Sequence, residues 1–184
     1  KEPYAFDPMD KLIWVRIKGR DEGFMVHGSE VYYISGKKKL WTRYLPDTEA
    51  SVNSYNSAGY LNEKAYYLTK QFKIKSVDRS GTIKEVSLKG IRPDLKVTGP
   101  YNYCFFQQAE ALYLLIGKGI YKLRESGEQE LTADLVLQTD VPGIFTYRNY
   151  PSLNLQVVGS ITHGLFLYRK KQFKALRHTN GYGN

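Results

Sequence analysis

The chain has 184 residues, 42% of them hydrophobic and 14% aromatic, which suits one folded domain with a proper core and leaves no room for more than two. Its net charge of +9 favours polyanionic partners in general and does not choose among nucleic acid, anionic lipid and acidic glycans. The single cysteine excludes an internal disulfide framework and a multi-cysteine metal site.

Local composition favours strands and a buried thiol. The 16 tyrosines favour β structure. Cys104 lies in the apolar run Tyr103–Phe106, so we expect a small buried core residue. The longest uninterrupted apolar run, Leu112–Ile116, is too short to span a bilayer, and residues 1–7 lack the apolar core of a signal peptide. We therefore expect a soluble chain with no membrane span in this segment, and one that can be a piece of a longer protein.

Short apolar segments recur along the chain with a long period. The clearest copy is Asn154–Leu176, in which the strand-like segment at Leu165 is followed by a basic turn and a further apolar segment. Counterparts of Leu165 are Ile120, Ile74 and Val31, and successive members of this series are 45, 46 and 43 residues apart. A period of about 40–50 residues is typical of a four-stranded propeller blade.

Each copy contains four candidate strands. In chain order these cover 4–6, 12–15, 31–34 and 40–44; then 57–60, 65–68, 73–77 and 83–88; then 103–106, 112–116, 119–123 and 129–132; and finally 144–147, 155–158, 164–168 and 173–176. The pattern predicts an all-β propeller of four-stranded antiparallel blades, with repeats over approximately 1–55, 56–101, 102–143 and 144–184. Four such units form either a small closed propeller or part of a larger one.

Two segments depart from the regular pattern. In the first copy, Gly19–Gly23 is rich in glycine and charge and predicts an extended loop inserted between the second and third strands. The best local helix candidate is Leu131–Leu137, although it falls where the repeat requires a connection between strands.

The repeat resembles a known family. Val158-Gly159-Ser160, followed by Gly164–Tyr168 and Phe173, is similar to the repeat of two-component regulator propellers, and Ile116-Gly117 with Gly119–Tyr121 is a further match. The first two copies lack the corresponding glycine turn. The resemblance implies that the chain belongs to the periplasmic sensing region of a hybrid two-component system. Many systems of this class detect fragments of polysaccharides. It therefore implies a periplasmic or extracellular, non-enzymatic sensor with an oligosaccharide ligand and an output carried elsewhere.

Catalytic patterns do not emerge from the sequence. The three histidines, His27, His163 and His178, are far apart and lack the spacing of metal ligands. No H-E-x-x-H or G-x-S-x-G motif occurs, and Gly117-Lys118-Gly119 does not open a phosphate-binding loop. We expect no catalytic residue, metal or cofactor.

In a propeller, the turns between second and third strands lie on the same face as the connections between blades. Lys70, Lys118 and Thr162 belong to these turns. The candidate ligand-binding residues on this face are Tyr55, Tyr101, Tyr103, His163 and Tyr182. Their rings suit stacking on sugars, and the polar groups suit hydrogen bonds to hydroxyls. The alternative is that the tyrosines pack the blade edges with their hydroxyls in water.

The opposite face collects basic residues from the other hairpins, namely Lys37, Lys38, Lys39, Arg79, Arg124, Arg169, Lys170 and Lys171. Such a face either binds a polyanion or keeps the hairpin tips solvated. The aromatic residues that single-stranded nucleic acid requires are not interleaved with these lysines, so no specific nucleic acid partner is expected. A β-propeller scaffold for protein or polyanion binding is the alternative to the sensor, and further propeller blades or a homodimer partner are possible.

Overall fold

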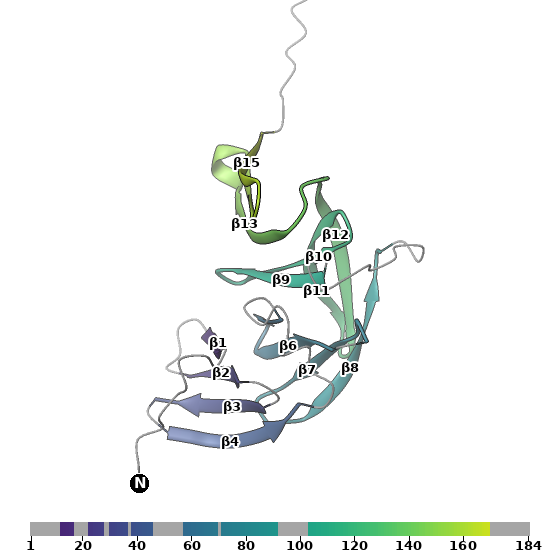
Figure 1. The fold of residues 1–184 in the computed structure, drawn as a ribbon. Coiled ribbons are helices and arrows are strands. Elements are labelled where there is room, and N and C mark those ends of the chain that lie inside the picture. The colour runs from purple at the N-terminus through teal and green to yellow at the C-terminus, as the bar shows by residue number, and fades with distance from the viewer. Residues whose placement is uncertain are drawn as a thin grey trace, which may run out of the picture.

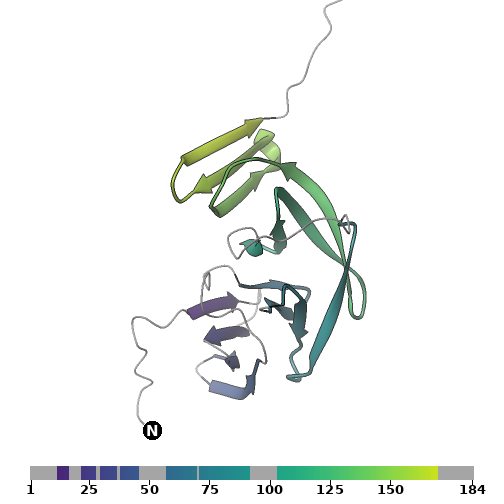
Figure 2. The same ribbon diagram turned by 45° about the vertical axis from the view of Figure 1, so that its right-hand side comes forward.

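The structure, a computed structural model, describes residues 12–16, 22–27, 30–36, 38–45, 57–69, 71–91 and 103–169, with the backbone alone for 12–16 and His27. Strands follow one another along the chain as successive antiparallel units, which we call blades 1 to 4. Figures 1 and 2 show the blades side by side in an open arc, with blade 1 at one end and blade 4 at the other. The predicted all-β architecture is confirmed.

The strands of each blade pair in sequence order. Blade 1 holds β1 (Leu12–Arg16), β2 (Glu22–His27), β3 (Glu30–Ser35) and β4 (Lys38–Tyr44); blade 2 holds β5 (Ala58–Leu61), β6 (Lys64–Leu68), β7 (Ile74–Val77) and β8 (Ile83–Lys89). Blade 3 holds β9 (Tyr103–Gln108), β10 (Ala111–Ile116), β11 (Gly119–Gly127) and β12 (Glu130–Gln138); blade 4 holds β13 (Ile144–Tyr150), the 3-10 turn η3 (Pro151–Leu153), β14 (Leu155–Ser160) and β15 (Gly164–Arg169). The predicted segment 173–176 lies outside the described residues.

Blades 2 and 3 share one continuous sheet, because their outermost strands pair with each other. Strand β8 runs parallel to β12, with Leu88 opposite Leu131. The Ser87 amide also donates to the Gln129 carbonyl oxygen over 2.9 Å. This pairing protects two edges that would otherwise be open to another strand.

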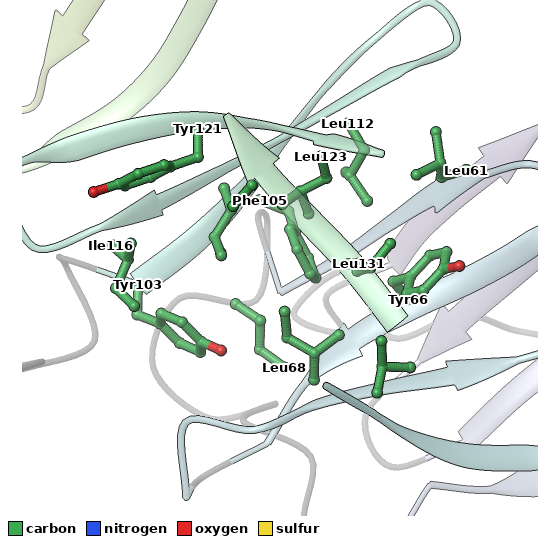
Figure 3. Close-up of a cluster of buried hydrophobic side chains, with 14 residues drawn as sticks. Leu61, Tyr66, Leu68, Tyr103, Phe105, Leu112, Ile116, Tyr121, Leu123 and Leu131 are labelled. Atoms are coloured by element: carbon green, nitrogen blue, oxygen red, sulfur yellow. The ribbon is translucent and has the colours of Figure 1, made fainter. Parts of the chain in front are cut away.

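Alternation along the strands sends side chains to the two neighbouring blades. In blade 3, Phe105 and Leu114 pack in the core shared with blade 2, whereas Phe106 and Tyr113 pack in the core shared with blade 4. Figure 3 shows the first of these cores, in which Tyr66 and the other labelled side chains converge between blades 2 and 3. Cys104 is buried as predicted, and burial raises the pKa of its thiol to about 12.

The prediction for the first copy is wrong upstream of β3. The segment 12–15 forms the edge strand of blade 1 rather than its second strand, and Gly23 belongs to β2, where it pairs with Arg16 and Ile34. Phe24 and Val26 are buried on one face of β2, so the strand is specified by alternation that begins directly after the glycine. Residues 4–6 and 19–21 lie outside the described residues.

The helix candidate Leu131–Leu137 is a strand. It forms most of β12, which pairs along its whole length with β11. Leu131 and Ala133 are buried on the same face and Leu135 is exposed, which fits two-residue alternation interrupted by irregular pairing. Pairing with β11 and β8 overrides the helix propensity of its leucine and alanine residues. Among the described residues, no helix has the length and apolar character needed to cross a bilayer.

Candidate functional site

The face that carries the turns between second and third strands, together with the connections between blades, is called the connection face. In the described residues it includes the turns at 69 and 71–73, at 117–118 and at 161–163, and the connection at 139–143. These segments lie at the same end of their blades. An even number of strands separates any two of them, and each strand reverses the direction of the chain.

Tyr103 is built into the packing of this face. Its side chain is buried, and its hydroxyl donates to the Phe72 carbonyl oxygen over 2.9 Å. The two rings meet edge to face with centroids 5.6 Å apart. Burial raises the pKa of Tyr103, so the phenol stays neutral. The ring therefore joins blade 3 to the turn of blade 2.

The connection between blades 3 and 4 is fixed to the turn of blade 3. The Thr139 amide donates to the Lys118 carbonyl oxygen over 2.9 Å, and the Thr139 hydroxyl lies 2.6 Å from that of Tyr168. The Lys118 ammonium and the Asp140 carboxylate form an exposed ion pair at 2.5 Å. This part of the face presents a cation already balanced by an anion.

Ser160 organises the turn that contains His163. The Ser160 hydroxyl donates to the Pro142 carbonyl oxygen over 2.7 Å and accepts from the amides of Thr162 and His163 over 3.3 and 3.2 Å. The Ile161 amide donates to the Gly143 carbonyl oxygen over 3.0 Å. The exposed side chains of Thr162 and His163 are thus held on a turn with fixed backbone geometry, with Oγ1 and Nδ1 2.6 Å apart.

The candidate ligand-binding residues divide into described and undescribed sets. Tyr55, Tyr101 and Tyr182 lie outside the described residues, as does Lys70. Tyr103 contacts the turn of blade 2, and His163 projects from the turn of blade 4. The two side chains therefore lie on the same face but in different blades.

The opposite face is less available to a polyanion than its composition indicates. The Arg79 guanidinium donates to the Tyr33 hydroxyl and the Glu22 carboxylate, both over 2.8 Å, and so links blades 1 and 2. Arg124 binds Asp134 through two hydrogen bonds of 2.7 and 3.0 Å. The Lys39 ammonium lies 5.1 Å from the ring centroid of Tyr32. Lys37, Lys170 and Lys171 lie outside the described residues.

Sequence reasoning missed two consecutive glutamines at the end of β9. The Gln107 side-chain oxygen Oε1 accepts from the Tyr60 backbone amide in blade 2 over 2.8 Å. The Gln108 side chain pairs with the backbone of Asn149 in blade 4, accepting over 2.7 Å and donating over 2.5 Å. The sequence signal for these contacts is a pair of adjacent glutamines on the innermost strand, because alternation directs their side chains toward opposite neighbouring blades.

A second missed feature is the carboxylate of Glu125 between blades 2 and 3. It accepts from the Tyr66 hydroxyl, and from Lys64 and Asn62 over 3.0 Å each. Burial alone would raise the pKa of Glu125, but these donors outweigh burial and hold it below its usual value. A cavity of about 420 Å³ lies beside it, lined by Leu61, Asn62, Glu110, Ala111, Lys122, Leu123, Arg124 and Glu125. The carboxylate is already occupied as an interblade contact.

No described group of three His, Cys, Asp or Glu side chains is arranged to hold a metal ion. The arrangement on the connection face is instead one of neutral donors and acceptors, a histidine and a balanced ion pair. It suits hydrogen bonding to a polar ligand.

Comparison with known proteins gives the fold. No protein-family model and no curated protein matches the chain. Among solved structures, it is similar to BamB from Moraxella catarrhalis, at 12% identity and a TM-score of 0.51 over 86% of this chain and 49% of that one. It is also similar to PorZ from Porphyromonas gingivalis, a surface component of the type-IX secretion system, at 10% identity and a TM-score of 0.50 over 90% of this chain and 20% of that one.

The chain thus spans about half of BamB and a fifth of PorZ. At this identity the likeness concerns the fold alone, and it does not single out the two-component regulator repeats. The chain has β-propeller architecture, with antiparallel blades of four strands in blades 1 to 3 and three described strands in blade 4.

Proposed function

We propose that this chain is a non-catalytic, ligand-binding propeller segment with a sensing role, and that its ligand is a neutral oligosaccharide bound on the connection face of blades 3 and 4. The observation that carries the proposal is the turn at His163. Its backbone is fixed by Ser160 while the side chains of Thr162 and His163 remain exposed. A preorganised turn reduces the ordering cost of binding.

The charge of this region favours a neutral ligand. Lys118 is paired with Asp140, so the local surface offers hydrogen-bonding groups without an excess of positive charge. Sugar hydroxyls both donate and accept, and they match such a mixture. The resemblance to two-component regulator propellers points to the same ligand class and to a periplasmic or extracellular location.

The side chains with catalytic potential support a binding role. The Cys104 thiol is buried with its pKa raised to about 12, so it does not supply a thiolate nucleophile. The His163 ring has a threonine hydroxyl at Nδ1, where a catalytic imidazole usually has a carboxylate.

Thermal-shift measurements with a panel of neutral oligosaccharides test the proposal. We expect at least one stabilising ligand at concentrations on the order of millimolar, with a shift that survives high salt. The shift should disappear in His163→Ala and persist in Ser152→Ala, a matched variant at an exposed position at the other end of blade 4. No shift from any sugar would overturn the proposal.

The alternative, a scaffold that binds polyanions through its basic face, predicts the opposite salt response. The affinity for heparin would then fall steeply with salt and would be unchanged in His163→Ala. The ion pairs of Arg79 and Arg124 make this alternative the weaker one.

A further inference from the structure

The repeat contains one position whose surroundings change at the end of the arc. Val31, Ile74, Ile120 and Leu165 occupy the same place in the third strand of the four blades. The first three are 1%, 3% and 0% exposed, and each belongs to the core shared with the following blade. Leu165 is 70% exposed. In blades 1 to 3 this position packs against the next blade, and in blade 4 it is exposed.

Leu165 belongs to a continuous apolar surface. Val158 is buried toward blade 3, so alternation directs Val157, Leu165 and Leu167 to the other side of blade 4. Leu167 pairs with Val157, and Leu165 with Gly159. The position that a Gly159 side chain would take is 2.4 Å from the Thr146 methyl group and 3.3 Å from atoms of both Leu165 and Phe145, so these side chains surround the glycine on this side of the blade. We call Phe145, Val157, Leu165 and Leu167 the outer face of blade 4.

The three existing interfaces indicate what covers such a face. Ile74 shares its core with Phe105 of β9 and Leu114 of β10, which come from the first two strands of the following blade. Ile120 likewise shares its core with Tyr147 of β13 and Val158 of β14. In each case the cover is an antiparallel sheet whose first two strands carry large apolar side chains at alternate positions.

We propose that the outer face of blade 4 binds a further propeller blade, one that lies outside these 184 residues and presents large apolar side chains from its first two strands. This inference concerns assembly and is independent of the proposed function. It follows from the repetition of one interface along the arc, in which Figure 2 shows blade 4 at the end of the described strands.

Blade 1 of a second copy is a poorer occupant. On the face of β3 that points away from blade 2, the buried Tyr32 donates its hydroxyl to the Glu30 carboxylate. The Lys39 ammonium lies 5.1 Å from the same ring. Packing leucines against these charged groups would remove them from water and carry a desolvation cost.

A duplicated blade provides the direct test. Residues 103–138 are appended after residue 184 through a flexible linker, with alanine at the copied Cys104 so that it adds no thiol. The rate of thiol labelling is then measured in Leu165→Cys, where the native Cys104 is buried and a slow competitor. We expect the appended blade to slow labelling at position 165 by about tenfold or more.

Two controls locate the effect. Leu153→Cys, exposed on the turn at the other end of blade 4, should label at the same rate with and without the appended blade. An appended blade with lysine at its copied Phe105 and Leu112 should give no protection at position 165. Equal labelling of Leu165→Cys in all three proteins would overturn the proposal.

A second measurement does not depend on the folding of the appended blade. In the 184-residue chain, Leu165→Lys combined with Leu167→Lys should leave the urea midpoint unchanged and should lower binding of a hydrophobic dye. Loss of folding would show that the face is already packed and would refute the proposal. A dimer seen in sedimentation and abolished by this variant would equally refute it, because the occupant would then be a second copy.

Discussion

Blades 3 and 4 have similar strand patterns and different surroundings. Blade 3 is packed on both faces, against blade 2 through Phe105 and against blade 4 through Phe106. Among the described residues, blade 4 is packed on one face only, and Ile120 is buried while its counterpart Leu165 is exposed. The same apolar pattern therefore sets which side of a strand is apolar. Whether that side contributes to stability depends on a neighbouring blade that covers it.

The contrast extends to close packing. A side chain at Gly59 would come within 2.2 Å of the Leu112 side chain, so a larger residue there would require Leu112 of blade 3 to shift. Gly164, at the start of β15, has no neighbour within 4 Å of the corresponding position. In the first case, glycine avoids a close contact between blades. In the second, the positive φ of 79° requires it.

The largest expected difference between the blades is in the cost of removing an apolar side chain. Phe105→Ala should lower the free energy of unfolding by about 3–5 kcal/mol, because it leaves a cavity in a filled core. Leu165→Ala should change it by less than about 0.5 kcal/mol, because its side chain is mostly in water. Urea unfolding followed by circular dichroism measures both, and similar losses would show that the two positions are equally packed.

Acid should separate the interface of blades 2 and 3 from that of blades 3 and 4. The pKa of Glu125 is lower in the folded chain than in the unfolded chain, so its stabilisation is fully present above the unfolded pKa of about 4.3 and is lost as pH falls through the folded pKa. Glu125→Gln should therefore cost about 1.5–3 kcal/mol at neutral pH, through weakened hydrogen bonds from Tyr66 and Lys64.

The difference between wild type and Glu125→Gln should shrink as urea titrations are repeated at progressively lower pH. Hydrogen exchange should show the acid effect first in β6 and β11, which carry the interacting groups. A difference that is constant with pH would mean that the carboxylate charge does not stabilise this interface.

The glutamine pair offers a finer separation of the two sides of blade 3. Gln108→Ala removes two hydrogen bonds to the Asn149 backbone and should cost about 1–2 kcal/mol. Amide exchange should accelerate at Asn149 and not at Tyr60. Gln107→Ala is the matched variant and should have the reverse effect, because its oxygen accepts from the Tyr60 amide. Acceleration at both amides in both variants would indicate that blade 3 opens as one unit.

The sequence was sufficient where alternation and turn signals coincide. The segment 112–116 predicts β10 almost to its ends, and Ile74 and Ile120 fall in β7 and β11 as expected. In the first copy, Glu22 and Gly23 resemble a turn, and only the ladder with β3 identifies them as strand. The period of the repeat places Val31 in the correct strand. It assigns the segment 12–15 to the second strand of the blade, whereas this segment is the first.

Other features depend on geometry between blades that a local pattern does not contain. The parallel pairing of β8 with β12 depends on how two blades are oriented, and the helix propensity of Leu131–Leu137 opposes it. The partners of Gln107 and Gln108 lie more than 40 residues away in the chain. On the connection face, sequence spacing places His163 on a turn, but it does not reveal the Ser160 contacts that fix the turn.

The smallest expected effect comes from an ion pair that lies within a single blade. Arg124 and Asp134 join adjacent strands of blade 3 and are largely exposed, so solvent screens their attraction and Arg124→Ala should leave the urea midpoint within experimental scatter. Arg79 has the same charge and is also partly exposed, but it bridges Glu22 of blade 1 to blade 2. Arg79→Ala should accelerate amide exchange in β2 and β3 while Arg124→Ala leaves these strands unchanged, because only the first removes a contact between blades. Equal exchange in the two variants would mean that blade 1 is held by its apolar core alone, with Phe24 and its neighbours sufficient to maintain the interface.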